Sequence, residues 1–201
     1  MRAEEIKDKI LFQVMNAEKN QELLEQVPHD RYLDLAIVFF YMEEGEDCRQ
    51  KVYLFDNRQL EYYGLTKERL KTWAMENTPR LLPVSFHSME DILREFHIWE
   101  KIGGGTEKLP LYVLTNAKMF LGAACVFYPE VLSSIGNAVQ TDYYILPSSI
   151  HECIILPASS GYSREELEEI VRQVNEAQVP EQEILSNHVY FYDKAAEKMY
   201  N

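Results

Sequence analysis

Apolar residues recur along this chain with two different periods, and segments of the two kinds alternate. Period-two alternation or a short continuous apolar run predicts strands at residues 33–42, 49–55, 111–115, 120–127, 143–146, 153–156 and 189–192. Apolar spacings of three and four predict helices at residues 3–26, 66–77 and 129–139, and two further helices that begin at residues 88 and 163. Polar residues suited to cap a helix, such as Thr66 and Ser163, support these starts.

The order of these elements predicts an α+β fold. Two strands followed by a helix occur near residues 33–77, again near 111–139 and again near 142–177, although no residue pattern repeats. Strands that follow one another across a short turn pair antiparallel. We therefore expect a mainly antiparallel sheet built from successive hairpins, each followed by a helix packed on the sheet. The hairpin at 142–157 is expected at the centre of this sheet, because both of its strands are apolar.

The expected domain organisation is an N-terminal amphipathic helix followed by one larger domain. The helix is predicted over residues 1–28, where Pro28 ends it, and it must pack on a later part of the chain or on a partner. Residues 29–201 are expected to form a single α+β domain with a flexible point at the three glycines 103–105. The prolines within residues 78–83 predict an extended segment there.

Composition narrows the class of protein. The 201 residues are 46% hydrophobic and 26% charged, which is ordinary for a folded protein, and the formal net charge is −13. So negative a surface disfavours nucleic acid and anionic membranes as partners. No apolar run approaches the roughly 18 residues of a transmembrane helix. Cys48, Cys125 and Cys153 are far apart and lie in or beside apolar runs, so we expect reduced, buried thiols and a cytoplasmic location.

The turn of the 142–157 hairpin holds the densest group of reactive side chains. Ser148, Ser149, His151 and Glu152 lie within five consecutive residues. A serine activated by His151 is one hypothesis, although no G-x-S-x-G elbow supplies an oxyanion hole. Glu152 would point away from His151 in an extended segment and is not expected to orient it. Ligand binding is a second hypothesis, and hydrogen bonds that hold the turn are a third, which we favour.

Other candidates for ligand contact are scattered along the sequence. Arg80 lies between two prolines, where a guanidinium would pair with a carboxylate or with an anionic ligand. Asn116 and His188 are further candidate binding residues near strands. No two histidines have the spacing of metal ligands, and H-E-x-x-H is absent, so no metal and no cofactor is expected.

Several segments taken together resemble an uncharacterised bacterial family, a domain of unknown function found largely in gut anaerobes. The segments that carry the resemblance are residues 76–83, 112–116, 122–124, 144–152, 174–175 and 186–190. The resemblance covers about residues 27–192. It implies a cytoplasmic bacterial protein, and it implies that the chain is a short form or a C-terminal portion of a longer one. It carries no activity, cofactor or partner.

The function expected from the sequence is therefore non-catalytic binding of an unknown protein or small-molecule ligand. Arg80, Asn116, Ser148, Ser149, His151 and His188 are the candidate ligand-binding residues. The alternative is a hydrolase-like enzyme with Ser148 or Ser149 and His151 at the turn. A homodimer formed through the N-terminal helix is a third option, and neither nucleic acid nor membrane is expected as a partner.

Overall fold

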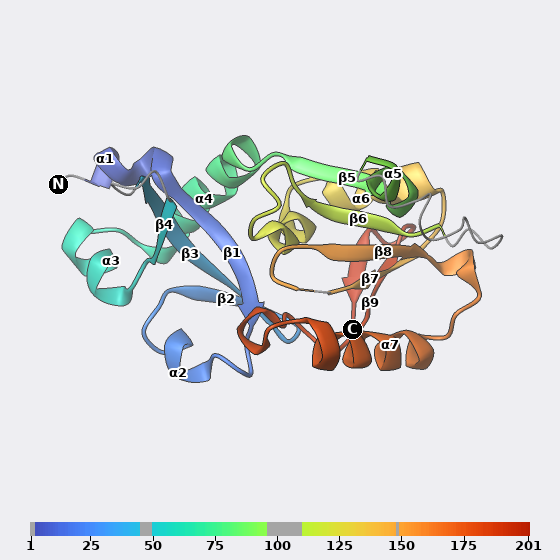
Figure 1. Ribbon diagram of the computed structural model, residues 1–201. Helices are drawn as coiled ribbons and strands as arrows, with labels where there is room; N and C mark the ends of the chain where they lie inside the picture. Colours follow the sequence, from blue (N-terminus) through green and yellow to red (C-terminus); the bar gives the residue numbers. More distant parts are fainter. Residues whose placement is uncertain (1–2, 45–49, 96–109, 148) are drawn as a thin grey trace. The chain divides into compact units, whose positions relative to one another are not determined.

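The computed structural model describes residues 3–44, 50–95, 110–147 and 149–201 (Figure 1). The fold is α+β, as predicted, but the strands form two antiparallel sheets instead of one. The sheets belong to two compact units, Met1–Pro83 and Val84–Asn201, called unit 1 and unit 2 below. The division falls at Pro83 and not after residue 28. The predicted flexible point at 103–105 lies outside the described residues.

Unit 1 is organised around one strand that is buried on both faces. Its elements are α1 (Ala3–Ile6), η1 (Lys7–Lys9), β1 (Ile10–Asn16), α2 (Gln21–Leu24), β2 (His29–Tyr32), β3 (Leu35–Glu44), β4 (Gln50–Leu54), α3 (Asn57–Tyr63) and α4 (Lys67–Leu81). β3 pairs antiparallel with β1, β2 and β4. The run from Leu35 to Phe40 is at most 5% exposed, which explains its continuous apolar sequence. The predicted central strand and its hairpin partner are confirmed.

The predicted N-terminal helix is wrong, because most of its apolar stripe belongs to β1. Ile10, Phe12 and Val14 are almost fully buried, and so is Leu11 on the opposite side of the strand. The edge of β1 that faces away from β3 is held by α4: Asn77 Nδ2 donates to the carbonyl of Ile10 at 3.0 Å. Tertiary burial and these side-chain bonds therefore outweigh the helical spacing of the sequence.

α4 continues through Pro79 to Leu81, where an extended segment was predicted. The Thr78 hydroxyl donates to the carbonyl of Ala74 at 2.7 Å and accepts from the Phe12 backbone N–H at 3.0 Å. Pro79 has no backbone N–H and so cannot donate the usual hydrogen bond within the helix. Because Pro79 lies in the last turn of α4, this missing bond disturbs little of the helix. The two hydrogen bonds of the Thr78 hydroxyl, one within α4 and one to β1, therefore hold the last turn of the helix against the strand.

Two lysines of α4 join the helix to β2 through Asp30. Lys67 Nζ lies 2.8 Å from Asp30 Oδ1, and Lys71 Nζ lies 2.7 Å from Asp30 Oδ2. Partial burial disfavours the charged carboxylate, but the hydrogen bonds from both lysines outweigh it and lower the pKa of Asp30 below its ordinary value of 3.8. The ionised form of Asp30 therefore stabilises the folded state.

Unit 2 contains a six-stranded antiparallel sheet. Its elements are β5 (Val84–Ser88), α5 (Met89–Glu95), β6 (Tyr112–Asn116), η2 (Gly122–Phe127), α6 (Val131–Val139), β7 (Tyr143–Leu146), β8 (Cys153–Pro157), η3 (Ala158–Ser160), α7 (Arg164–Gln178), η4 (Glu181–Glu183), β9 (Tyr190–Asp193) and β10 (Lys198–Tyr200). The strand order is β10-β9-β7-β8-β6-β5. The hairpin predicted at 142–157 is confirmed as β7 and β8, the two central strands.

The two faces of this sheet are covered by different helices. Leu146 and Leu156 on one face pack in a buried cluster with Leu167 of α7. Tyr143 points to the other face, where its hydroxyl donates to the carbonyl of Leu132 in α6 at 2.8 Å. α7 begins with the predicted capping box at Ser163. Unit 2 is therefore a sheet between two helical layers.

The strand predicted at 120–127 is wrong. The segment folds as η2, a 3₁₀ helix packed against β6. A Cβ atom on Gly122 would collide with Thr115 Oγ1 and with the carbonyl oxygen of His151. Gly122 therefore allows the close approach of this segment to the backbone of the β7–β8 turn. The C-terminal strand β10 pairs antiparallel with β9.

We expect Asp30→Asn to lower the free energy of unfolding by about 1 kcal/mol at neutral pH. A carboxyl group whose pKa is lower in the folded state stabilises that state fully at pH values above its unfolded-state pKa. This stabilisation is lost as the pH falls through the folded-state pKa. The difference between the two proteins should therefore shrink as the pH falls below 3.8, the ordinary pKa of the group. Urea unfolding at several pH values measures this, with Glu176→Gln in an exposed ion pair of α7 as the control. A difference that does not change with pH would contradict the ion-pair account.

We expect Gly122→Ala to destabilise the protein by about 3 kcal/mol, because the new methyl group overlaps two oxygen atoms of neighbouring segments. Gly136→Ala is the matched control, since a Cβ there meets only ordinary contacts, the nearest at 3.4 Å. That change should be neutral or stabilise by up to about 1 kcal/mol, because Gly136 lies inside a helix. Thermal unfolding of both variants compares them. Equal effects would disprove the close packing at Gly122.

Candidate functional site

The turn between β7 and β8 is closed by its own hydrogen bonds. The Ser149 hydroxyl donates to Glu152 Oε1 at 2.9 Å and accepts from the His151 backbone N–H at 3.0 Å. The N–H of Ile150 donates to the carbonyl of Glu183 in η4 at 2.9 Å. Ser149 is only 5% exposed. The side chain of Ser149 therefore holds the turn, and Ser148 lies outside the described residues.

His151 connects this turn to the loop before η2. Its Nδ1 accepts a hydrogen bond from the Leu121 backbone N–H at 3.1 Å, so the neutral ring carries its proton on Nε2. Nε2 lies 3.9 Å from Glu183 Oε1. The carbonyl of His151 accepts from the Thr115 hydroxyl at 2.8 Å. Leu121 has a positive φ of 53°, and the bond to His151 helps to hold this unfavourable backbone conformation.

The geometry does not join Ser149 and the His151 ring as nucleophile and base. A general base must accept the proton of the nucleophilic hydroxyl. Here the Ser149 hydroxyl proton points to Glu152, and the ring acceptor of His151 is used by Leu121. The expectation that Glu152 does not orient His151 agrees with these contacts.

Asn116 caps the loop that follows β6. It is fully buried, and its Nδ2 donates to the carbonyl of Phe120 at 2.7 Å. Its Oδ1 accepts from the backbone N–H of Lys118 at 3.0 Å. Both ends of the amide are therefore used within the loop, and Asn116 presents no polar group to a ligand.

The remaining predicted candidates are not assembled around the turn. Arg80 belongs to unit 1, where it is exposed and donates to Asn77 Oδ1 at 3.1 Å. His188 is exposed in unit 2, and its Nδ1 lies 3.9 Å from Glu168 of α7. Within the described ranges, no group of three or more His, Cys, Asp or Glu residues could hold a metal ion. The turn therefore brings together Asn116, Ser149 and His151 only as parts of one hydrogen-bonded structure.

The described cysteines are buried and poorly suited to nucleophilic chemistry. Cys125 and Cys153 are free thiols, as predicted, and Cys48 lies outside the described residues. Burial raises the pKa of Cys125 to about 12, and its Sγ donates to the carbonyl of Thr115 at 3.1 Å. Burial also raises the pKa of Cys153. Neither thiol forms an appreciable amount of the reactive thiolate at neutral pH.

An apolar groove beside α7 was not predicted from the sequence. It has a volume of about 260 Å³ and is lined almost wholly by hydrocarbon, from β7 and β8 on one side and α7 on the other. Leu146 and Ile154 line the sheet side, and Ile170 and Val174 line the helix side. This helix was predicted to pack on the sheet, yet Ile170 on its apolar face is 42% exposed. Periodicity shows which face of a helix is apolar, but it does not show whether that face is fully covered.

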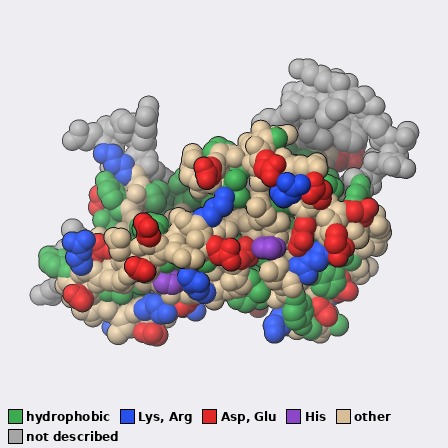
Figure 2. Space-filling model, turned by 90° about the horizontal axis from the view of Figure 1, so that it is seen from below, with side chains coloured by type: hydrophobic (Ala, Val, Ile, Leu, Met, Phe, Trp, Pro, Cys, Tyr) green, Lys and Arg blue, Asp and Glu red, His purple; other side chains and the backbone are tan. Residues whose placement is uncertain are grey.

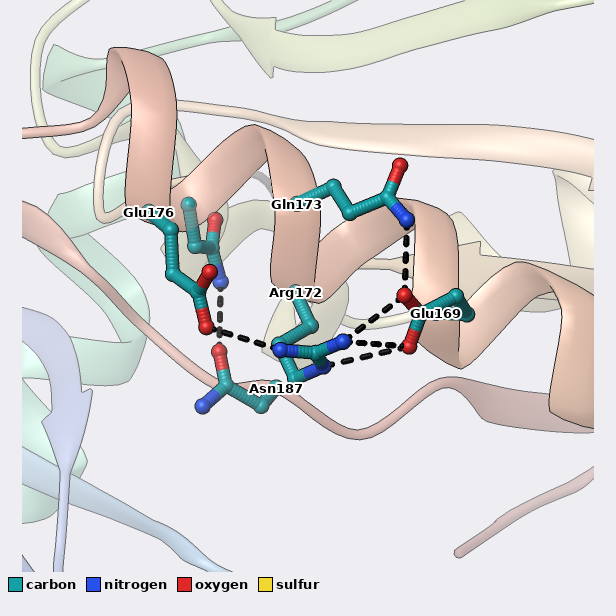
Figure 3. A network of polar contacts seen from close by, with 6 residues as sticks. Glu169, Arg172, Gln173, Glu176 and Asn187 are labelled. Atoms are coloured by element: carbon teal, nitrogen blue, oxygen red, sulfur yellow. Dashed lines mark hydrogen bonds and ion pairs between the residues drawn. The ribbon is translucent and has the colours of Figure 1, made fainter.

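The outer surface of α7 carries paired charges. Arg172 contacts Glu169 at 2.7 Å and Glu176 at 2.9 Å (Figure 3). Asn175, which is 2% exposed, donates through Nδ2 to the carbonyl of Ser186 and to Asn187 Oδ1, both at 2.9 Å. These bonds hold the segment before β9 against α7. The groove therefore has a firmly anchored helix as one wall.

The structure defines a class: an α+β protein of two antiparallel units, with a buried polar turn and an apolar groove in unit 2. The chain belongs to a family of unknown function (DUF5688), whose family model matches residues 1–194. No curated protein and no solved structure matches the chain. In the part of the chain that the structure describes, no helix is long and apolar enough to cross a membrane.

We expect His151→Leu to destabilise the protein by about 1–3 kcal/mol, because it leaves the Leu121 N–H without its acceptor. His188→Leu is the control, since that side chain is 54% exposed and should change stability little. Urea unfolding followed by circular dichroism measures both variants. If the His151 variant were as stable as the wild-type protein, the anchoring role of the ring would be disproved.

Proposed function

We propose that this protein is a non-catalytic binding domain whose groove beside α7 takes an apolar side chain of a protein partner. The observation that carries the proposal is the exposure of Ile170, which is 42% open to solvent at a groove lined by hydrocarbon. Concave apolar surfaces of this kind mark binding sites, whereas single exposed apolar residues do not. An inserted apolar side chain would lose its contact with water and gain packing contacts.

The composition of the lining favours a protein partner over a small molecule. Small-molecule sites combine apolar walls with a few placed polar groups that fix the orientation of the ligand. In this groove, Tyr162 is the lining residue that carries a side-chain polar group. Protein interfaces instead bury apolar anchors in such pockets and place their polar contacts at the rim. An apolar anchor from a partner therefore fits better than a polar metabolite.

The charge around the groove predicts what flanks this anchor. Four acidic residues of α7 precede Ile170, namely Glu165, Glu166, Glu168 and Glu169. Figure 2 shows acidic side chains spread over the face that it presents, with lysine and arginine side chains between them. The chain as a whole carries a formal net charge of −13. Opposite charges on two partners speed their association, and like charges disfavour it. We therefore expect basic residues on either side of the apolar anchor.

The proposal shifts the expected binding surface away from the β7–β8 turn. Leu146 lines the groove and is the last residue before that turn. The polar side chains of Ser149 and His151 are used in internal hydrogen bonds, so their role in the proposal is to hold the strands that form one wall.

The test is site-specific photo-crosslinking from position 170. p-Benzoylphenylalanine replaces Ile170 in the full chain, and in a matched variant it replaces Arg172 on the opposite side of the same helix. In cells of the source organism, we expect an adduct from position 170 and none from position 172. Its cross-linked peptide should hold an apolar residue flanked by lysine or arginine. A synthetic copy of this peptide should bind the wild-type protein and lose about tenfold in affinity with Ile170→Glu.

Two results would overturn the proposal. Equal adducts from both positions would show non-specific contact. An adduct only with a second copy of the chain would make the groove a self-association surface. Because Ile170 is partly exposed, Ile170→Glu should leave the unfolding transition close to that of the wild-type protein, which separates lost binding from lost folding.

A further inference from the structure

A row of aromatic rings in unit 1 runs from the core to the surface. Tyr41 and Tyr53 are opposite each other in β3 and β4, and their rings stack with centroids 5.3 Å apart. Phe55 contacts Tyr41 at 6.5 Å and Tyr63 at 5.9 Å. Tyr63 in turn contacts Tyr62 at 5.0 Å, edge to face. We call these five residues the aromatic row.

Exposure increases toward both ends of the aromatic row. Phe55 is fully buried, whereas Tyr53 is 39% exposed and Tyr62 is 72% exposed. The row is thus anchored in the core at its middle, and its outer rings meet solvent. Rings held by ring–ring contacts lose little further conformational entropy when a ligand stacks on them.

Acidic side chains lie beside the aromatic row. Glu43 lies two residues after Tyr41 in β3, so the two side chains emerge on the same face of the strand. Burial is the main cause of the raised pKa of Tyr63, and the neighbouring Tyr41, Tyr62, Glu43 and Glu5 add to it. Lys51 is opposite Glu43 in the strand register, but these two residues form no ion pair among the described contacts. The negative potential of these carboxylates adds to that of the ring faces, and both attract cations.

We propose that the aromatic row, with Glu5 and Glu43 beside it, is an interaction surface for a lysine or arginine side chain of a basic protein segment. An ammonium or guanidinium group gains from the ring faces and from the carboxylates together. Phosphates and carboxylates would be repelled by the same groups. The surface lies in unit 1 and is argued from contacts within that unit, so it does not rest on the groove of unit 2.

The experiment measures the binding of a fluorescein-labelled peptide of alternating glycine and arginine residues by fluorescence anisotropy at physiological salt. The matched probe replaces every arginine with citrulline, which keeps the shape and removes the charge. We expect the arginine peptide to bind and the citrulline peptide not to bind. Tyr53→Leu combined with Tyr62→Leu should weaken binding by about tenfold. Glu43→Gln should weaken it by about threefold.

Matched controls separate this surface from general attraction to an acidic protein. Tyr200 has the same 39% exposure as Tyr53 but lies in unit 2, so Tyr200→Leu should leave the affinity within about twofold. Glu181→Gln removes one exposed charge of unit 2 and should also have little effect. Equal weakening by Glu181→Gln and Glu43→Gln would overturn the proposal, as would absence of binding to the wild-type chain. Ile170→Glu should leave peptide binding unchanged, so this test is independent of the groove.

The variants are chosen so that loss of folding cannot imitate loss of binding. Tyr62 is largely exposed, so Tyr62→Leu alone should leave the unfolding transition unchanged. The same variant should lower the affinity for the arginine peptide by about threefold. If the single variant bound as tightly as the wild-type chain and only the double variant lost affinity together with stability, the rings would be structural and the proposal would be disproved.

Discussion

Buried backbone groups that need a hydrogen-bond partner constrain both units. In unit 1, Asn77 and Thr78 reach from α4 to the outer edge of β1, and without them an edge strand would leave polar groups unsatisfied. In unit 2, His151 and Asn116 do the same for the loop before η2. Such groups are costly to bury alone, so each unit depends on a few polar side chains that come from distant parts of the chain.

The same constraint explains why side chains that suggested chemistry in the sequence serve structure. Serine, histidine and asparagine are typical catalytic residues, and they are also the residues best able to bond the backbone. Ser149 donates to Glu152, and the His151 ring accepts from Leu121, so the hydrogen-bonding groups that catalysis would need are already used. Sequence proximity placed these side chains in one turn, but hydrogen-bond direction decides what they can do.

The elements that local pattern alone determines were predicted well. The β7–β8 hairpin, the central strand β3 and the capped starts of α4 and α7 depend on alternation and on caps within a few residues. β1 and η2 were mistaken because distant contacts decide them. The apolar residues of β1 fit a helix by spacing alone, but β3 and α4 hydrogen-bond to its two edges and hold it as a strand. η2 forms where Gly122 meets the β7–β8 turn. The aromatic row and the groove combine residues far apart in the sequence, and no periodicity could have shown them.

Polar side chains that are hydrogen-bonded inside the fold and apolar side chains that are exposed to solvent differ in what they can offer a partner, and the exposed apolar ones mark the expected binding surfaces. Polar side chains that are fully used inside a fold have little to offer a ligand, whereas Ile170 and Tyr62 leave apolar surface in water, where it costs free energy. Both proposed surfaces have carboxylates nearby, in a chain of net charge −13. A partner that gains from either surface must bring apolar or cationic groups, and the same charge rejects phosphate-rich partners. In the groove, specificity would then come from where acidic and apolar atoms meet, because its lining has few hydrogen-bonding groups.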